Sequence, residues 1–223
     1  MGEHDALSDL IERLKQTGLA DFPGKLLYSS LDTLRPGKLY LLGYNPGGDP
    51  AEESESVASH LRHMPAGWNE YVDAEWRPAG IRRRPGSAPR QRRVQWLLAH
   101  LGLPVRSVCA SNLIFVRSKS SAGLSDPDRM AEQCWPVHRF ILERVRPACI
   151  LSIGGKDVWE FVCEHSRMLT PVEPHASGHG NWQCLSARIE LDRRQMTFVT
   201  VPDVTRYAID RHENVVRWIA SQL

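Results

Sequence analysis

The sequence predicts an α/β fold in which helices cover both faces of a parallel sheet. Three short apolar runs, at 39–42, 108–116 and 148–153, alternate with segments that have helical spacing. Alternating strands and helices are joined by crossover connections, which make neighbouring strands parallel. With 223 residues, of which 42% are hydrophobic and 24% charged, the chain is expected to form a single domain over 1–223.

The chain opens with a predicted helix and reaches its first strand at residue 39. A helix over 4–17 is indicated by an apolar stripe with helical spacing, formed by Leu7, Leu10, Ile11 and Leu14. After an irregular stretch, the run 39–42 predicts a buried strand that ends in the turn GYNPGG, residues 43–48. Such a turn before a helix presents backbone N–H groups at the carboxyl edge of a sheet, where open α/β sheets bind ligands.

The region between the first two strands combines aromatic and basic residues. A helix is predicted from Ala51 to about Gly67, and an aromatic segment follows over 67–76. No acidic residue occurs between Glu75 and Asp126. The basic residues of this interval are Arg77, Arg82, Arg83, Arg84, Arg90, Arg92, Arg93, Arg106, Arg117 and Lys119. An exposed loop of this charge attracts phosphate backbones, although a solvated loop without a partner is an alternative.

The middle of the chain continues the alternation of helices and strands. A helix that stops at Gly102 leads to the strand 108–116, whose polar residues predict an end near Asn112. Asp126 and Pro127 predict the N-cap and first position of a long helix. The next predicted strand, 148–153, ends in two glycines and is followed by a short helix.

The last third of the chain is expected to contain a loop, a hairpin and a helix. Proline and glycine predict a loop over 167–180. Apolar runs at 185–191 and 197–201, on either side of a polar turn, predict a β-hairpin or two paired strands. A final helix is predicted over 209–220.

Three of the predicted strand ends carry polar residues that a core does not need. They are Asn45, Asn112 and the group Asp203, Thr205 and Arg206. An unpaired buried amide costs about 1–3 kcal/mol, so Asn112 is expected to have a partner or to face a cleft. Because the carboxyl ends of parallel strands share an edge of the sheet, these residues are expected to converge.

Four segments, in this order, resemble motifs of the uracil-DNA glycosylase superfamily. GYNPGG at 43–48 is similar to the GxNPG form of the first motif, and SNLIFVR at 111–117 resembles the strand whose asparagine reads the flipped base. ILSIGG at 150–155 is similar to the central strand and its turn, and VPDVTRY at 201–207 lies where the closing motif, usually His-Pro-Ser, belongs. The resemblance extends from about residue 30 onward. It implies a three-layer α/β/α fold with a central four-stranded parallel sheet.

The resemblance also implies roles for individual residues. Asn45 would hold the attacking water, and Asn112 would form paired hydrogen bonds with the Watson–Crick edge of a base turned out of DNA. The implied base-binding residues are Gly43, Tyr44, Tyr71, Asn112 and Trp68. Tyr71 is expected to stack on the base, with Trp68 behind it, a contact worth about 1–3 kcal/mol.

A second group of residues is expected to contact DNA. It consists of Arg82, Arg83, Arg84, Arg90, Arg92, Arg93, Thr205, Arg206 and Tyr207. The arginines before residue 94 would hold phosphates. Tyr207 follows the closing motif, where family members place the loop that penetrates the duplex, so it is expected either to act as a wedge or to pack at a helix start.

The closing motif departs from the family at Asp203, which is expected to belong to the catalytic pair with Asn45. The family has histidine at this position, near the base oxygen that gains negative charge. An imidazole donates a hydrogen bond there, whereas an ionised carboxylate does not. Asp203 is kept protonated by burial, faces the sugar to stabilise a cation or activate water, or is structural and pairs with Arg206 or Arg117; we favour the last interpretation.

The leading hypothesis is therefore a monomeric, cytoplasmic DNA glycosylase that removes uracil or another deaminated or damaged base. The alternative is a catalytically weak or inactive member that binds nucleic acid or a nucleotide, and a nucleoside-processing enzyme is a third option. No metal, iron–sulfur cluster or other cofactor is expected, because the cysteines form no CxxC pair and His175 and His179 have no third ligand nearby. No membrane contact is expected, because no apolar run approaches the ~20 residues that span a bilayer.

Overall fold

A computed structural model describes residues 3–52, 54–77 and 81–223, and within them it forms a seven-stranded, mostly parallel sheet. The parallel strands, in spatial order, are β2 (Cys109–Asn112), β1 (Leu39–Gly43), β3 (Cys149–Ser152) and β7 (Arg194–Thr200). Three antiparallel strands extend this sheet beyond β7, namely β6 (Gln183–Leu191), β4 (Arg167–Met168) and β5 (Glu173–Ala176).

The expectation of a four-stranded sheet is wrong, because the sheet does not end at its four parallel strands. The predicted hairpin is confirmed as β6 and β7, and Asp192 and Arg193 in its turn have φ angles of 48° and 63°. Positive φ at both central residues is the conformation of a tight two-residue hairpin turn. The loop predicted over 167–180 contains β4 and β5. Both strands are short, and their mostly exposed residues do not alternate between buried and exposed positions.

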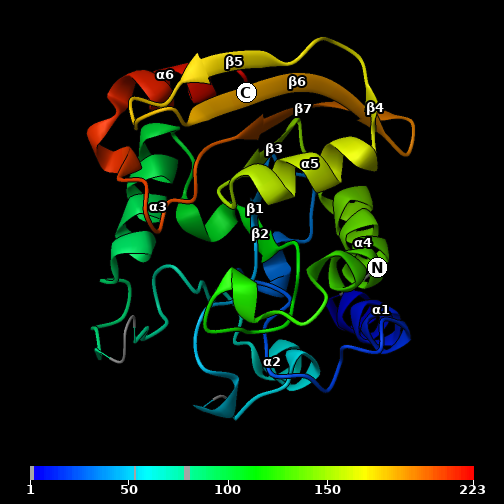
Figure 1. Cartoon of the computed structure of the whole chain (residues 1–223). Coiled ribbons are helices and arrows are strands. Elements are labelled where there is room, and N and C mark those ends of the chain that lie inside the picture. The colour runs from blue at the N-terminus through cyan, green and yellow to red at the C-terminus, as the bar shows by residue number, and fades with distance from the viewer. Residues whose placement is uncertain (1–2, 53, 78–80) are drawn as a thin grey trace.

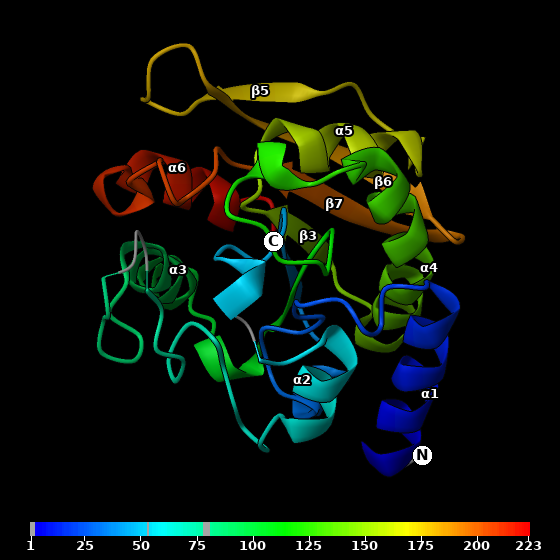
Figure 2. The same ribbon diagram turned by 60° about the horizontal axis from the view of Figure 1, so that its bottom comes forward.

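Helices pack on both faces of the sheet, an arrangement compatible with three layers (Figures 1 and 2). One core contains residues of α1 (Glu3–Gln16), α2 (Val57–His63), α4 (Pro127–Val145) and α5 (Lys156–Glu164). The other core contains residues of α3 (Pro89–His100) and α6 (Glu213–Ala220). Successive residues of β1 alternate between the two cores, as the pleat of a strand requires: Leu39 and Leu41 face one, Tyr40 and Leu42 the other.

The helix predictions are confirmed in position, with differences at two ends. The N-cap prediction is confirmed, because Asp126 Oδ1 accepts a hydrogen bond of 3.2 Å from the backbone N–H of Arg129. The helix predicted from 51 to 67 is shorter, since α2 begins at Val57 after a 3₁₀ turn over Pro50–Glu52, and residue 53 lies outside the described residues. The last helix begins at Glu213, after another 3₁₀ turn.

Two further expectations concern parts of the chain outside the cores. Residues 78–80, which belong to the predicted basic loop, lie outside the described residues. Within the described ranges, no helix has the length and apolar character that crossing a membrane demands.

Candidate functional site at the carboxyl edge of the sheet

The first motif and the exit of β2 form one continuous backbone unit. Gly43 and Asn112 are partners in the parallel register of β1 and β2. Beyond them, Leu113 donates its N–H to Gly43 O at 2.9 Å and Ile114 donates to Tyr44 O at 2.9 Å. The pairing therefore continues past the ends of both strands, which places Asn45 and Asn112 at the same edge of the sheet.

The Asn45 side chain is anchored through its amide nitrogen. Nδ2 donates to Ser118 Oγ at 2.8 Å, to Pro46 O at 3.0 Å and to Val116 O at 3.3 Å. Because all three neighbours are acceptors, they settle which end of the amide is nitrogen. Within the described residues Oδ1 accepts no hydrogen bond, so the oxygen of this half-buried side chain is the atom left for a ligand.

Asn112 is the opposite case, an amide that is fully buried and unpaired. The side chain is 0% exposed, and neither Nδ2 nor Oδ1 has a hydrogen-bond partner among the residues that the structure describes. A Cβ atom built on Gly43 would lie 2.0 Å from Asn112 Oδ1, so only glycine leaves room for this amide. Of the two predicted alternatives for Asn112, a partner or a cleft, the first is not met, because no described residue pairs with the amide.

The third motif brings the remaining strand ends together. A Cβ atom on Gly154 would lie 2.8 Å from the backbone nitrogen of Tyr44 and 3.0 Å from the carbonyl carbon of Gly43. A Cβ atom on Gly155 would lie 3.7 Å from the backbone nitrogen of Asp203. The turn after β3 thus lies between the first motif and the closing segment, which we define as residues 202–207.

Two arginines in the first turns of α3 hold the closing segment. Arg93 Nη1 donates to the backbone oxygens of Val204 and Thr205, both at 2.8 Å, and Arg93 Nε lies 3.6 Å from Asp210. Arg90 Nη1 donates to Thr205 Oγ1 at 3.3 Å. These two arginines, expected to bind phosphates, therefore face the protein.

Asp203 lies at the start of this closing segment with its carboxylate partly exposed. Its Oδ1 accepts a hydrogen bond of 2.7 Å from the N–H of Thr205 and lies 3.8 Å from Arg90 Nη1. Its backbone oxygen accepts from the N–H groups of Arg206 and Tyr207. Asp203 thus has a structural role in the turn, and its ion pair with Arg90 is one that the sequence analysis did not consider.

Arg90 has a second, unpaired side. Its side chain is only 16% exposed. Nε and Nη2 are buried and have no hydrogen-bond partner with acceptable geometry in the described part of the chain. The Cβ atom built on Gly43 would lie 2.7 Å from Arg90 Nη2. The guanidinium of Arg90 and the amide of Asn112 therefore meet over the same glycine, and we call this pair the Asn112–Arg90 cluster.

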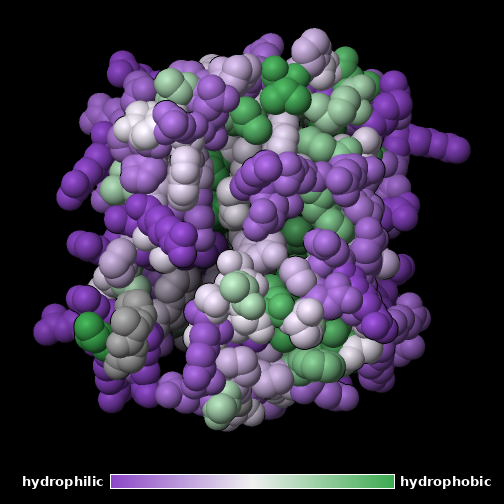
Figure 3. Space-filling view, in the orientation of Figure 1, coloured by the Kyte–Doolittle hydropathy of each residue, from purple (hydrophilic) through white to green (hydrophobic). Residues whose placement is uncertain are grey.

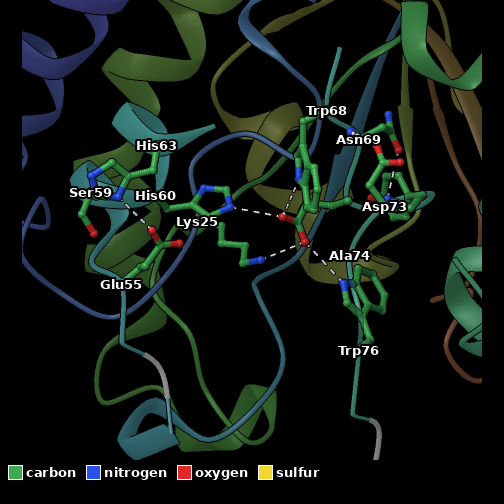
Figure 4. A network of polar contacts seen from close by, with 12 residues as sticks. Lys25, Glu55, Ser59, His60, His63, Trp68, Asn69, Asp73, Ala74 and Trp76 are labelled. Carbon is green, nitrogen blue, oxygen red and sulfur yellow. Dashed lines mark hydrogen bonds and ion pairs between the residues drawn. The ribbon is translucent and has the colours of Figure 1, made fainter. Parts of the chain in front are cut away.

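The aromatic segment is organised around the buried carboxylate of Glu70 (Figure 4). This group is 1% exposed and accepts hydrogen bonds from Lys25 Nζ at 2.8 Å, Trp68 Nε1 at 3.0 Å, His60 Nε2 at 3.1 Å and Trp76 Nε1 at 3.3 Å. Burial opposes ionisation, but the bonds from His60 and Lys25 outweigh it and hold the pKa of Glu70 well below its usual range. We call these five residues the Glu70 network.

The predicted base-binding aromatics occupy different environments. Tyr71 is 1% exposed, and its ring packs against Tyr28 and Trp76 with centroids 5.6 and 5.9 Å away. Burial raises the pKa of Tyr71, and the nearby Arg90 guanidinium acts against that rise. Trp68 belongs to the Glu70 network. Tyr44 is half-buried against the core that contains residues of α4 and α5, and burial, followed by the charges of Asp157 and Asp128, raises its pKa.

The remaining predicted DNA contacts divide into exposed and buried residues. Arg82, Arg83, Arg84, Arg92, Thr205 and Arg206 are exposed, and Arg82 pairs with Glu75 at 2.6 Å. Tyr207 is fully buried, donates a hydrogen bond of 2.6 Å to Ser177 O, and stacks on His212. In this structure Tyr207 is a packed aromatic rather than a protruding wedge.

Sequence reasoning missed two features of this site, the inward direction of Arg90 and the presence of Tyr28. Pro89 at the first position of α3 was the available signal for Arg90, because it fixes where the helix starts. Tyr28 comes from the irregular stretch before β1. Burial raises the pKa of Tyr28, the charge of Lys25 opposes that rise, and the charge of Glu70 adds to it. No periodic pattern marks that stretch.

Other regions offer less convergent chemistry. A hollow of about 210 Å³ lies at the opposite edge of the sheet, where Leu39 begins β1 and Val108 precedes β2, and Arg35 and Lys38 contribute to its wall. Among the described residues, no group of three His, Cys, Asp or Glu side chains is placed to hold a metal. The face seen in Figure 3 is mainly hydrophilic, with hydrophobic residues in separate small patches.

Comparison with known proteins adds no assignment. No protein-family model matches the sequence, and no curated protein matches it significantly. The functional reading of the site therefore depends on its residues and their geometry.

Proposed function

We propose that this chain is a DNA glycosylase that hydrolyses the N-glycosidic bond of uracil or another deaminated or damaged base turned out of DNA. Asn112 carries the proposal, because its buried amide offers a donor and an acceptor side by side, neither of which is paired with any residue that the structure describes. Uracil, hypoxanthine and xanthine each present a carbonyl oxygen next to an N–H, which is the complementary pattern. Such a base would relieve the desolvation of both amide atoms at once.

The reaction requires a base site and a water site at the same edge, and Asn45 supports the second. The C1′–N bond breaks, and its electron pair leaves with the base. A water whose O–H donates to Asn45 Oδ1 adds its oxygen to C1′, and its proton passes to the departing base. Because three acceptors fix Asn45 Nδ2, the orientation of Oδ1 is set before the substrate binds.

DNA binding in this proposal belongs to the exposed arginines. Arg82, Arg83, Arg84 and Arg92 would contact phosphates, and the exposed Thr205 and Arg206 would lie against the strand. Gly43 would let the base approach the backbone, with Tyr44 and Tyr71 at the boundary of its site. Action as a monomer and in the cytoplasm are parts of the same proposal.

The proposal is tested by base release from single- and double-stranded oligonucleotides that carry uracil, hypoxanthine or xanthine. We expect release of at least one base, and a fall of about 100-fold or more in kcat/KM for Asn112→Ala and for Asn45→Ala. Asn214→Ala, on the exposed face of α6, is the matched control and should retain the wild-type rate. Folded wild-type protein in excess that releases none of these bases would contradict catalysis.

Asp203 motivates a second candidate, a weak or inactive member that binds nucleic acid or a nucleotide. A carboxylate at this position supplies no hydrogen bond to a departing base. This candidate predicts DNA affinity that falls steeply with salt, without any product. Gain of uracil excision by Asp203→His would favour it, and turnover of free nucleosides without a polymer would indicate a nucleoside-processing enzyme instead.

A further inference from the structure

Arg90 is distinguished from the other arginines of the basic interval by where its charge lies. It extends from the first turn of α3 into the protein, with its side chain 16% exposed. Asp203 and Thr205 contact its Nη1. Nε and Nη2 keep buried N–H groups that have no acceptor of acceptable geometry among the described residues. The guanidinium is thus held on one side by the closing segment, and among the described residues its other side is buried next to Asn112 and the Tyr71 hydroxyl.

That unsatisfied side points to the place where Asn112 is also unsatisfied. Measured from a Cβ atom built on Gly43, Arg90 Nη2 lies at 2.7 Å and Asn112 Oδ1 at 2.0 Å. The Tyr71 hydroxyl also lies near the guanidinium, which opposes the burial-driven rise of its pKa. A ligand read by Asn112 would therefore have the Arg90 N–H groups beside it.

The chemistry of the leaving base needs such a donor. When the C1′–N bond breaks, the electron pair moves onto the ring and its carbonyl oxygens. Donors placed in advance where charge develops are among the largest contributions to catalysis. A guanidinium stays charged over the whole physiological range and presents several N–H groups in a fixed plane. Asp203 cannot donate, but by pairing with Nη1 it can fix the plane of that guanidinium.

We propose that Arg90 is the catalytic residue that stabilises the negative charge on the departing base, and that Asp203 and Thr205 position its guanidinium. This assignment rests on the proposed glycosylase function. No bond to Arg90 forms or breaks: the electron pair of the C1′–N bond goes to the base, Arg90 donates hydrogen bonds to the resulting anion, and the anion then takes the proton that the added water releases. Asp203 is thus a positioning residue rather than a replacement for histidine.

The test compares Arg90→Ala with the wild type on oligonucleotides that carry uracil or 5-fluorouracil. We expect single-turnover release of uracil to fall by about 100- to 1,000-fold. The loss should be clearly smaller for 5-fluorouracil, whose anion is more stable and needs less help. Added guanidinium ion should restore part of the variant's rate on uracil and leave the wild type unchanged. A merely structural role of Arg90 would change both substrates equally and give no rescue.

Two further variants keep the result interpretable. Arg129→Ala removes an exposed arginine from the first turn of α4 and should release uracil at the wild-type rate. Arg90→Lys keeps the charge without the planar group and should remain well below the wild type, even if Arg90→Ala does not fold. An active wild type with an equally active Arg90→Ala overturns only this assignment, whereas a folded wild type that releases no base overturns the proposed function and this assignment together.

Discussion

The Glu70 carboxylate and the Asn112–Arg90 cluster are buried close together but in opposite states, although His60 Nδ1 in the Glu70 network is also buried without a partner among the described residues. Consecutive residues of α3 reach both: Gln91 Nε2 donates to the Glu70 backbone oxygen at 2.8 Å, and Arg90 extends to the cluster. Every contact that the Glu70 carboxylate needs comes from the protein, whereas four buried nitrogen and oxygen atoms of the cluster have no partner of acceptable geometry in the described residues.

This difference separates a structural role from a functional one. A buried charge with full hydrogen bonding organises the segments that donate to it, here the chain around Lys25, α2 and the aromatic segment. Buried polar atoms without partners lower stability by about 1–3 kcal/mol each, so they persist where a ligand satisfies them. The cluster is the better candidate for chemistry, although the Glu70 network holds the more strongly perturbed carboxylate.

The largest expected effect is the loss of the Glu70 charge. Glu70→Gln leaves Lys25 partly buried without its counter-charge, so the free energy of unfolding should fall by about 3–5 kcal/mol in urea titrations. The control is Glu160→Gln, which breaks the exposed i,i+4 pair with Lys156 and should cost under about 1 kcal/mol. If both variants lost the same free energy of unfolding, the Glu70 network would contribute no more to stability than an exposed ion pair does.

A second prediction uses pH and concerns the buried imidazole of His138, which belongs neither to the Glu70 network nor to the Asn112–Arg90 cluster. His138 is fully buried; it accepts from the Tyr40 hydroxyl through Nδ1 at 2.8 Å and donates to Leu113 O through Nε2 at 3.0 Å. Burial lowers the pKa of His138 to about 4 from 6.5, against the opposing effect of backbone hydrogen bonds.

The sign follows from proton uptake by the unfolded chain. Between pH 6.5 and 4 the histidine of the unfolded chain binds a proton that the folded protein excludes. The contribution of His138 to the free energy of unfolding is therefore complete above pH 6.5 and is lost as the pH falls toward 4. The difference in unfolding free energy between wild type and His138→Gln should therefore change by about 3 kcal/mol across this window. Glu70 adds a further loss below pH 4.5, because its folded pKa is lowered. If the difference in unfolding free energy between wild type and His138→Gln did not change with pH, His138 would not be buried in its neutral form.

A third prediction concerns Asn45, whose side-chain nitrogen donates to three acceptors and whose side-chain oxygen accepts no hydrogen bond from the described residues. Asn45→Asp places a group that cannot donate against three acceptors, so the unfolding free energy should fall by about 1–3 kcal/mol. Asn181→Asp, in the exposed loop before β6, is the matched control and should change stability by less than about 0.5 kcal/mol. Unchanged stability of Asn45→Asp would mean that the first motif is not anchored through this amide.

The smallest expected change is a gain in stability rather than a loss, and it concerns Asn112. Asn112→Leu replaces an unpaired buried amide by an apolar group of similar shape, so the unfolding free energy should rise by about 1 kcal/mol while base release is lost. Asn69→Leu is the control, since that buried amide donates to Val105 O and accepts from Tyr71 N–H, both at 3.0 Å. The free energy of unfolding of Asn69→Leu should fall by about 2 kcal/mol. A loss in both variants would place Asn112 among the structural amides.

The helices and parallel strands were predictable because their signals are local. The N-cap Asp126, the stop of α3 near Gly102 and the hairpin around Asp192 each depend on residues within one or two turns of the chain. β4 and β5 were missed for the complementary reason, because their pairing with β6 comes from tertiary contact and their own residues carry no alternation. Polar residues at strand ends predicted the edge at which Asn45 and Asn112 meet.

By itself, the sequence determined the order of the helices, the parallel strands and the hairpin, the shared edge and the candidate residues Asn45, Asn112 and Asp203. Only the tertiary structure decided which polar atoms are satisfied there. Asp203 pairs with Arg90, Asn45 is anchored by its nitrogen, and the Asn112 amide next to Gly43 has no hydrogen-bond partner in the part of the chain that the structure describes. Periodicity specifies which face of an element is buried, whereas hydrogen bonding between distant segments depends on how those faces pack, and no local pattern encodes it.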